Sequence, residues 1–129
     1  GFGYFEHFHT GIKMCRAEIY IKTEDLENAY VAISEIRNTK LPSEPEVTKF
    51  LLLLLYSILG NADQSFKEYS ELKDIWGINK LSTSISNHHY AYKHAGLRKD
   101  LRYIDMLKEL KLYDYWKDDP EIKKLEKGK

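Results

Sequence analysis

The sequence has little of the residue types that hold small domains together covalently or through metals. Among its 129 residues there is one cysteine, Cys15, which excludes an internal disulfide and a zinc-type cysteine cluster. A single cysteine fits a protein of a reducing compartment. Only 3 prolines and 7 glycines are present, so long disordered tracts are not expected. The composition therefore predicts one globular domain over residues 1–129.

Net charge and long apolar runs are also missing. Twenty Lys and Arg residues balance twenty Asp and Glu residues, which argues against a strong non-specific binder of polyanions. The apolar run over residues 50–55 is far shorter than the ~20 residues that cross a bilayer, and we expect no membrane partner. The chain begins with Gly1 and shows no signal-peptide pattern, from which we expect a segment of a longer protein.

Sequence motifs that carry catalysis are missing as well. The chain contains no Gly-rich phosphate loop, nucleophile elbow, paired-carboxylate motif or metal-ligand spacing. His88, His89 and His94 lie close in sequence, but His88 and His94 fall on nearly opposite faces of a helix. Packing or surface roles are expected for them rather than a zinc site. We therefore expect no enzyme activity, no cofactor, no metal and no small-molecule substrate.

The most apolar stretch of the chain, residues 49–59, dominates the sequence. A helix that is apolar almost all round must be covered on several sides, because it cannot stand alone in water. Gly60 and Asn61 then predict a turn, and Gly77 suits the end of the helix that follows. The apolar stripe of that second helix consists of Phe66, Tyr69, Leu72 and Ile75.

A pair of helices is predicted before this stretch. The first covers residues 12–22 and the second about residues 25–39, with Thr23 as the N-cap of the second. Pro42 and Pro45 prevent the second helix from continuing. The stripe expected to face the core in the first helix is Ile12, Cys15, Ile19 and Ala17. The corresponding stripe in the second helix is Leu26, Ala29, Tyr30, Ile33 and Ile36.

A third pair is predicted after the apolar stretch. The triplet Ser82, Thr83, Ser84 opens it, and its helices cover residues 85–95 and 97–112 with a turn at Gly96. The sequence Asp118-Asp119-Pro120-Glu121 is typical of a helix N-terminus, because Asp caps well and Pro fits the first turn. A short last helix over residues 119–127 is therefore expected.

The three pairs repeat with a period of 36 residues. The repeat begins from three equally spaced tyrosines, Tyr20, Tyr56 and Tyr92. Four residues after each tyrosine comes the turn between helices, at Glu24, Gly60 and Gly96. One hairpin cannot bury its own apolar face, so neighbouring hairpins are expected to stack. The sequence therefore predicts an all-α fold, a right-handed superhelical array with units at residues 11–46, 47–82 and 83–118 and a terminal helix.

These units resemble a known family. YIKTEDLENA, YSILGNADQS and YKHAGLRKDL are similar to the Y-x-x-x-G-x-x-x-x-A core of tetratricopeptide and pentatricopeptide repeats. The period favours the pentatricopeptide group, whose repeats run to about 35–36 residues rather than ~34. The middle unit adds Val47-Thr48 at its opening and Gly77-Ile78 near its close. The first unit departs from the pattern because it lacks the turn glycine, and the third because Leu101 stands where a small residue is usual.

The resemblance implies single-stranded RNA as a partner, read at one nucleotide per repeat by two side chains. In this register the pairs are Cys15 with Glu46, Leu51 with Ser82, and Asn87 with Asp118. The Asn–Asp combination is the one that the family uses for uridine, whereas Leu51 cannot form a hydrogen bond with a base. The RNA-binding candidates are Asn87, Asp118, Thr48, Ser84 and Ser82.

Two further interpretations remain open. Neutral net charge favours a tetratricopeptide-like scaffold that binds a protein or peptide on its concave face, or a structural part of a ribonucleoprotein. Trp76 and Trp116 each follow a second helix, and either capping of the hairpin core or stacking on a base suits them. The family resemblance implies a mitochondrial or other organellar role in RNA metabolism or translation; otherwise an intracellular location is expected.

Overall fold

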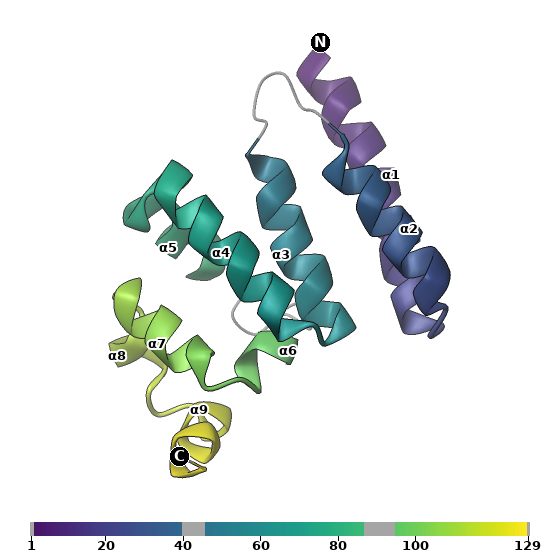
Figure 1. Ribbon diagram of the computed structural model, residues 1–129. Helices are drawn as coiled ribbons and strands as arrows, with labels where there is room; N and C mark the ends of the chain where they lie inside the picture. Colours follow the sequence, from purple (N-terminus) through teal and green to yellow (C-terminus); the bar gives the residue numbers. More distant parts are fainter. Residues whose placement is uncertain (1, 40–45, 87–94, 129) are drawn as a thin grey trace.

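The computed structural model describes residues 2–39, 46–86 and 95–128, and over these residues the chain is all helical without a strand (Figure 1). The predicted all-α class is confirmed. No helix of the described residues is long and apolar enough to cross a bilayer. The helices are α1 (Phe2–Lys22), α2 (Leu26–Arg37), α3 (Val47–Leu59), α4 (Ala62–Trp76), α5 (Ile78–Ser86), α6 (Ala95–Arg98), α7 (Arg102–Glu109), α8 (Tyr113–Trp116) and α9 (Pro120–Lys127).

The first four helices form two hairpins whose turns have the same geometry, 36 residues apart. Glu24 and Gly60 both adopt a left-handed backbone, with φ of 60° and 85°. The residues that follow them, Asp25 and Asn61, cap α2 and α4 by accepting from the backbone N–H three positions later. In each turn the N–H of the capping residue donates to the carbonyl of the tyrosine five positions earlier, at 2.9 Å. The turns of the first two hairpins thus recur at the predicted spacing of 36 residues.

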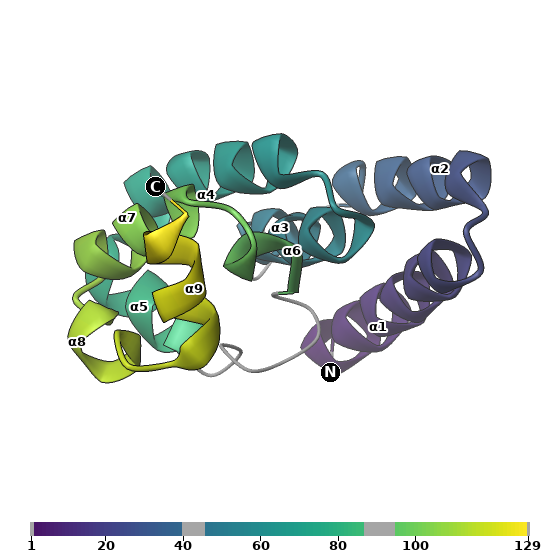
Figure 2. The same ribbon diagram turned by 90° about the horizontal axis from the view of Figure 1, so that it is seen from below.

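Helix α3 lies in the middle of the molecule and is covered on opposite sides. It packs against α1 and α2 on one side and against α4 and α6 on the other (Figures 1 and 2). Leu52 and Leu55 belong to the apolar cluster of the first hairpin, whereas Phe50, Leu53 and Leu54 belong to a larger cluster that continues into the C-terminal helices. The expectation that an all-apolar helix needs several neighbours is confirmed.

A buried carboxylate joins the first hairpin to the second. The carboxylate of Glu68 in α4 belongs to a residue that is only 1% exposed. Arg37, the last residue of α2, donates to Glu68 Oε1 at 2.9 Å and to the Tyr56 hydroxyl at 3.0 Å. Lys49 Nζ lies 3.9 Å from Glu68 Oε2. Because a buried carboxylate without its cation costs several kcal/mol, this contact fixes how α2 sits against α4.

The contact between α3 and α6 is unusually close. Gly96 in α6 lies so near α3 that a Cβ added to it would stand 2.1 Å from the carbonyl oxygen of Ser57. The next residue, Leu97, donates its N–H to Ser57 Oγ at 3.3 Å. Ser57 is buried, and the hydrogen bond from Leu97 gives its hydroxyl group a partner within an otherwise apolar contact. Gly96 is therefore needed for close approach between two helices.

The expected core face of α1 was wrong at three of its four positions, and only Ala17 is buried. Ile12, Cys15 and Ile19 are exposed, whereas Met14 and Ala17 are buried. Helix α1 carries apolar residues on two opposite faces, and periodicity alone does not show which one the core takes. The face that packs contains the small Ala17, which lets neighbouring helices come close.

The expected bounds of the first hairpin also need correction. Helix α1 begins at Phe2 rather than at residue 12, since nothing between the aromatic start and Gly11 breaks a helix. Thr23 is not the N-cap of α2, because its hydroxyl donates back to the Ile19 carbonyl at 2.9 Å. Asp25 is the cap. In α2, Leu26 and Tyr30 are exposed while the other three residues of the expected stripe are buried.

The third unit differs most from the expectation. Ser82, Thr83 and Ser84 lie inside α5 and do not open a helix. The helix expected over residues 97–112 is divided between α6 and α7, and Gly96 belongs to a helix rather than to a turn. The expected helix over residues 85–95 falls mostly outside the described residues. The last helix is confirmed: Asp119 caps α9 and Pro120 is its first residue.

Substitution of Gly96 tests the close contact between α6 and α3. We expect Gly96→Ala to lower the free energy of unfolding by about 1–3 kcal/mol, because backbone would have to move. The matched control is Gly11→Ala in α1, where an added Cβ meets nothing within 4 Å; a helical Ala there should stabilise by up to about 1 kcal/mol. Urea unfolding measures both. Equal effects of the two variants would contradict the assigned contact.

Candidate functional site

A groove of about 550 Å³ lies between α5 and the segment that joins α7 to α8. We call it the α5–α8 groove. One wall is polar and the other is aromatic. Its lining residues are Asn79, Ser82, Thr83, Ser86, Leu110, Lys111, Leu112, Tyr115 and Trp116.

Helix α5 supplies the polar wall through helical spacing. Asn79, Ser82, Thr83 and Ser86 are separated by three, one and three residues, so they share one face of α5. The opposite side of α5 places Leu81 and Ile85 in the core, and this burial orients the polar face outward. Ser82 Oγ donates to the carbonyl of Leu110 at 3.0 Å and so ties α5 to the end of α7.

The turn between α7 and α8 holds a lysine in a strained conformation. Lys111 has φ of 61°, in the left-handed region that L residues avoid. The turn repeats the hydrogen bond seen in the first two hairpins, because Leu112 N–H donates to the Leu107 carbonyl five positions earlier at 2.8 Å. Glycine would fit this place with less strain. Because the left-handed backbone of Lys111 costs stability, we take this lysine as a candidate functional residue.

Helix α8 supplies the aromatic wall. Tyr115 is 79% exposed, while Trp116 is half-buried against the larger apolar cluster. Their ring centroids lie 6.5 Å apart at an angle of 54°. Exposed aromatic rings offer flat surfaces for stacking, and the hydroxyl and amide groups across the groove offer donors and acceptors. The groove therefore suits a planar, polar ligand group.

Among the described residues, the predicted RNA-binding candidates do not lie together. Ser82 lines the α5–α8 groove, whereas Ser84 lies on another face of α5 and donates to the Lys80 carbonyl at 3.1 Å. Thr48 is buried in the first turn of α3. Asp118 is exposed before α9 and lies 3.8 Å from Lys123 Nζ. The remaining candidate, Asn87, lies outside the described residues, as do the three clustered histidines.

Of the two other pairs of the predicted code, Ser82 lines the groove, whereas its partner Leu51 and the pair Cys15 and Glu46 lie apart from it. Leu51 is half-buried against the apolar cluster of the first hairpin. Cys15 is exposed on α1, and Glu46 is half-buried just before α3. The expectation of a core position for Cys15 was wrong. In the described part of the chain no three His, Cys, Asp or Glu side chains are grouped so that they could hold a metal ion.

Most of the groove was missed by the sequence reasoning. The polar face of α5 begins at Asn79, ahead of the position expected for the third unit. Lys111 was expected inside a continuous helix, so its strained turn gave no signal. The adjacent aromatic residues Tyr115 and Trp116 were the available signal, and only Trp116 was considered. The spacing of Asn79, Ser82, Thr83 and Ser86 is itself helical and indicates a polar helix face, which is the sequence signal for the polar wall.

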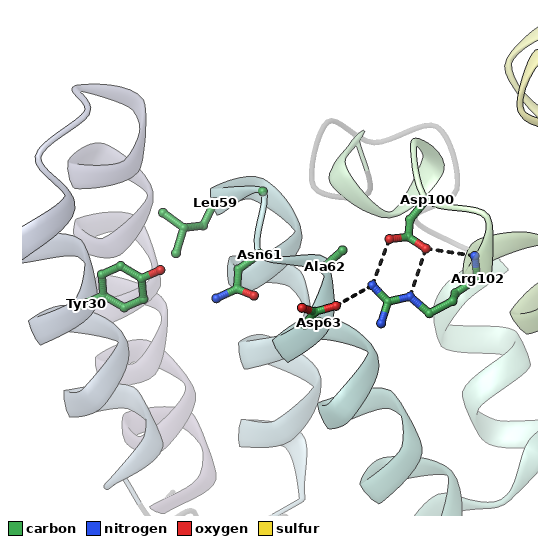
Figure 3. Close-up of a pocket in the computed structure, with 8 residues that line it drawn as sticks. Tyr30, Leu59, Asn61, Ala62, Asp63, Asp100 and Arg102 are labelled. Carbon is green, nitrogen blue, oxygen red and sulfur yellow. Dashed lines mark hydrogen bonds and ion pairs between the residues drawn. The ribbon is translucent and has the colours of Figure 1, made fainter. Parts of the chain in front are cut away.

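A second hollow, of about 380 Å³, lies between α2 and the two turns around Gly60 and Asp100 (Figure 3). Arg102 donates to Asp63 Oδ1 at 2.8 Å and to both oxygens of Asp100 at 2.9 and 3.0 Å. These hydrogen bonds hold the pKa of Asp100 below its usual range. Tyr30 lies across the hollow from this group. The ion pairs join the start of α4 to the start of α7, and we assign them a structural role.

A second polar contact holds the end of α7, next to the groove. The Tyr69 hydroxyl donates to Glu109 Oε1 at 2.5 Å, and Lys73 Nζ lies 3.1 Å from both oxygens of that carboxylate. The hydrogen bond from Tyr69, followed by the nearby lysine, lowers the pKa of Glu109. Burial, together with the carboxylate, raises the pKa of Tyr69. Helix α7 thus ends at a fixed place against α4.

Removal of the Tyr69 hydroxyl tests this contact. We expect Tyr69→Phe to raise the pKa of Glu109 toward its usual value of about 4.3, measured by NMR titration of the carboxyl carbon. Because a lowered carboxyl pKa stabilises the fold above the unfolded pKa and this stabilisation is lost on acidification, the variant should lose less stability below about pH 4. Tyr113→Phe, which removes a hydrogen bond to Glu126 instead, is the control. An unchanged Glu109 pKa in Tyr69→Phe would refute the contact.

Comparison with known proteins assigns no family to the chain. Neither models of protein families, nor curated proteins, nor solved structures gave a match. The proposal of function therefore rests on two features, the geometry of the α5–α8 groove and the repeated hairpin turn. The groove combines an exposed tyrosine, a strained lysine and one polar helix face.

Proposed function

We propose that the chain is a pentatricopeptide-like module, a right-handed superhelical array of helical hairpins, and that it binds single-stranded RNA. Support for the array comes from the two turns that repeat at 36 residues, each with a left-handed residue followed by a capping side chain. Further support is the stacking of the second hairpin on the first through α3. The divided third unit closes one end of this array.

The chemistry of the α5–α8 groove is the main support for the proposal of RNA binding. Nucleobases of single-stranded RNA stack on exposed aromatic side chains, and Tyr115 presents such a ring. Asn79 and Thr83 on the opposite wall offer polar groups to the edge of a stacked base. The ammonium group of Lys111 supplies a positive charge for a phosphate.

The balanced charge of the chain sets the expected strength of binding. Non-specific affinity for nucleic acid comes from neutralised phosphates, and few cations line the groove. Stacking should therefore contribute more than charge, and binding should weaken only modestly with salt. The family resemblance favours a setting in organellar, mitochondrial RNA metabolism or translation, within a longer protein or a larger complex.

A protein-binding scaffold is the second candidate function, favoured by a separate observation. The first hairpin exposes large apolar residues on both of its helices, and such surfaces often mark contacts with proteins. The exposed residues are Ile12, Ile19, Leu26, Tyr30 and Val31. Leu51 supports this alternative too, because the side chain at its code position packs against the core.

Loss of the exposed ring tests RNA binding directly. We expect fluorescence anisotropy with uridine-rich single-stranded RNA to show binding that Tyr115→Ala weakens about tenfold, since one stacked base contributes ~1–3 kcal/mol. Tyr30→Ala, which removes another exposed tyrosine on α2, should leave affinity unchanged. Absence of binding at both ~50 and ~150 mM salt would exclude the RNA function and leave the scaffold.

Replacement of the strained lysine separates function from stability. Lys111→Gly should raise the free energy of unfolding by up to about 1 kcal/mol, because glycine accepts a positive φ, and should weaken RNA binding several-fold through the lost charge. Glu24→Gly relieves the same strain in the first hairpin and is the matched control. It should stabilise similarly without loss of affinity. Equal RNA affinity of both variants would show that Lys111 does not contribute to RNA binding.

A further inference from the structure

A second groove, of about 580 Å³, lies between α9 and the turn that joins α6 to α7. We call it the α6–α9 groove; α9 is the yellow helix of Figure 1. Leu101 from the turn and Leu125 from α9 give it apolar surface. Leu101 is 40% exposed and Leu125 is half-buried, so both leucines remain open to a ligand. Of the described residues that line this groove, none belongs to the α5–α8 groove.

Positive charge surrounds these two leucines. Among the described residues, Arg98, Lys99 and Lys124 line the groove together with one carboxylate, that of Glu121. Arg98 Nε donates to Glu121 Oε2 at 2.8 Å, and this ion pair joins the two walls of the groove. Three positive charges thus stand against one negative charge that already has a partner. The groove carries a net positive charge, although the chain as a whole is neutral.

The two lysines are exposed and have no anionic partner in the chain. Lys99 comes from the turn before α7 and Lys124 from α9, so each wall of the groove contributes one ammonium group. Within the described part of the chain, neither lysine takes part in a hydrogen bond or ion pair. Unpaired cations around an apolar surface are complementary to a ligand that is apolar in its middle and acidic at its edges.

We propose that the α6–α9 groove docks an acidic peptide segment of a partner protein. A large apolar side chain of the peptide packs against Leu101 and Leu125, and its carboxylates pair with Lys99 and Lys124. The lining favours a peptide over RNA, because among the described residues it contains no aromatic ring for stacking and no amide or hydroxyl side chain for a base edge. This docking does not depend on RNA binding at the α5–α8 groove.

Fluorescence anisotropy with a labelled peptide tests the docking. The probe has about 12 residues, with two phenylalanines among Asp and Glu, and a matched neutral probe carries Asn and Gln in their place. We expect the acidic probe to bind the full chain with a dissociation constant on the order of 10–100 µM at ~50 mM salt. Binding should weaken at ~300 mM salt, because salt screens exposed charges. The neutral probe should bind about tenfold more weakly.

Two variants with matched controls locate the bound peptide. Lys124→Gln should weaken the acidic probe several-fold, whereas Lys67→Gln, which removes another exposed lysine on α4, should leave its affinity unchanged. Leu101→Ser should also weaken it several-fold through lost apolar contact. Serine is favoured at an N-cap, the place of Leu101 before α7, so the fold should be kept. Leu26→Ser, at an exposed leucine that begins α2, is the control.

Three results would overturn the proposal. The first is no binding of the acidic probe up to ~1 mM chain, or equal binding of the neutral probe. The second is unchanged affinity for the acidic probe in both Lys124→Gln and Leu101→Ser, with circular dichroism showing that both fold. The third concerns uridine-rich RNA, whose affinity should be the same for Lys124→Gln and the wild-type chain. An RNA affinity that falls as far as the peptide affinity would assign this groove to RNA instead.

Discussion

The structure depends on one constraint: the eleven-residue stretch over residues 49–59, which is apolar almost all round, must be kept from water. Helix α3 meets it by taking the middle of the molecule, between the first hairpin and the C-terminal helices. A specific contact holds each neighbour against α3. The first hairpin is held through Arg37, which donates to the Tyr56 hydroxyl of α3 and pairs with the buried Glu68 of α4, and α6 is held close by the absence of a side chain at Gly96. The two apolar clusters of the chain meet at α3.

The sequence was sufficient where local chemistry decided the outcome. Gly60, Asn61 and Gly77 fixed the ends of α3 and α4, because left-handed glycines and amide caps act within one turn of chain. The sequence was insufficient where more than one face of a helix could have packed in the core. Helix α1 offers two apolar faces, and tertiary contact decided between them. The 36-residue repeat predicted a turn at Gly96. Its actual place against the Ser57 carbonyl arises from a contact with a residue 39 positions earlier in the sequence.

The candidate surfaces lie where the predicted repeat pattern is incomplete. The first hairpin leaves Ile12, Cys15 and Ile19 of α1 exposed, and the third unit is divided into short helices that create the α5–α8 groove. In the middle hairpin packing occupies the corresponding surface: Leu51, the position expected to read a base, packs against the apolar cluster of the first hairpin. Of the four candidate residues in the described part of the chain, Ser82 alone lines the groove, because the location of the groove depends on where α5 begins.

The most direct test of the account is an NMR titration of the two tryptophan side chains with uridine-rich single-stranded RNA. Trp116 forms part of the aromatic wall of the groove, whereas the indole N–H of Trp76 is buried near the ring of Phe50. The account predicts that the indole signal of Trp116 shifts in a saturable way while that of Trp76 stays in place. A Trp116 signal that does not move at saturating RNA would contradict binding at this groove.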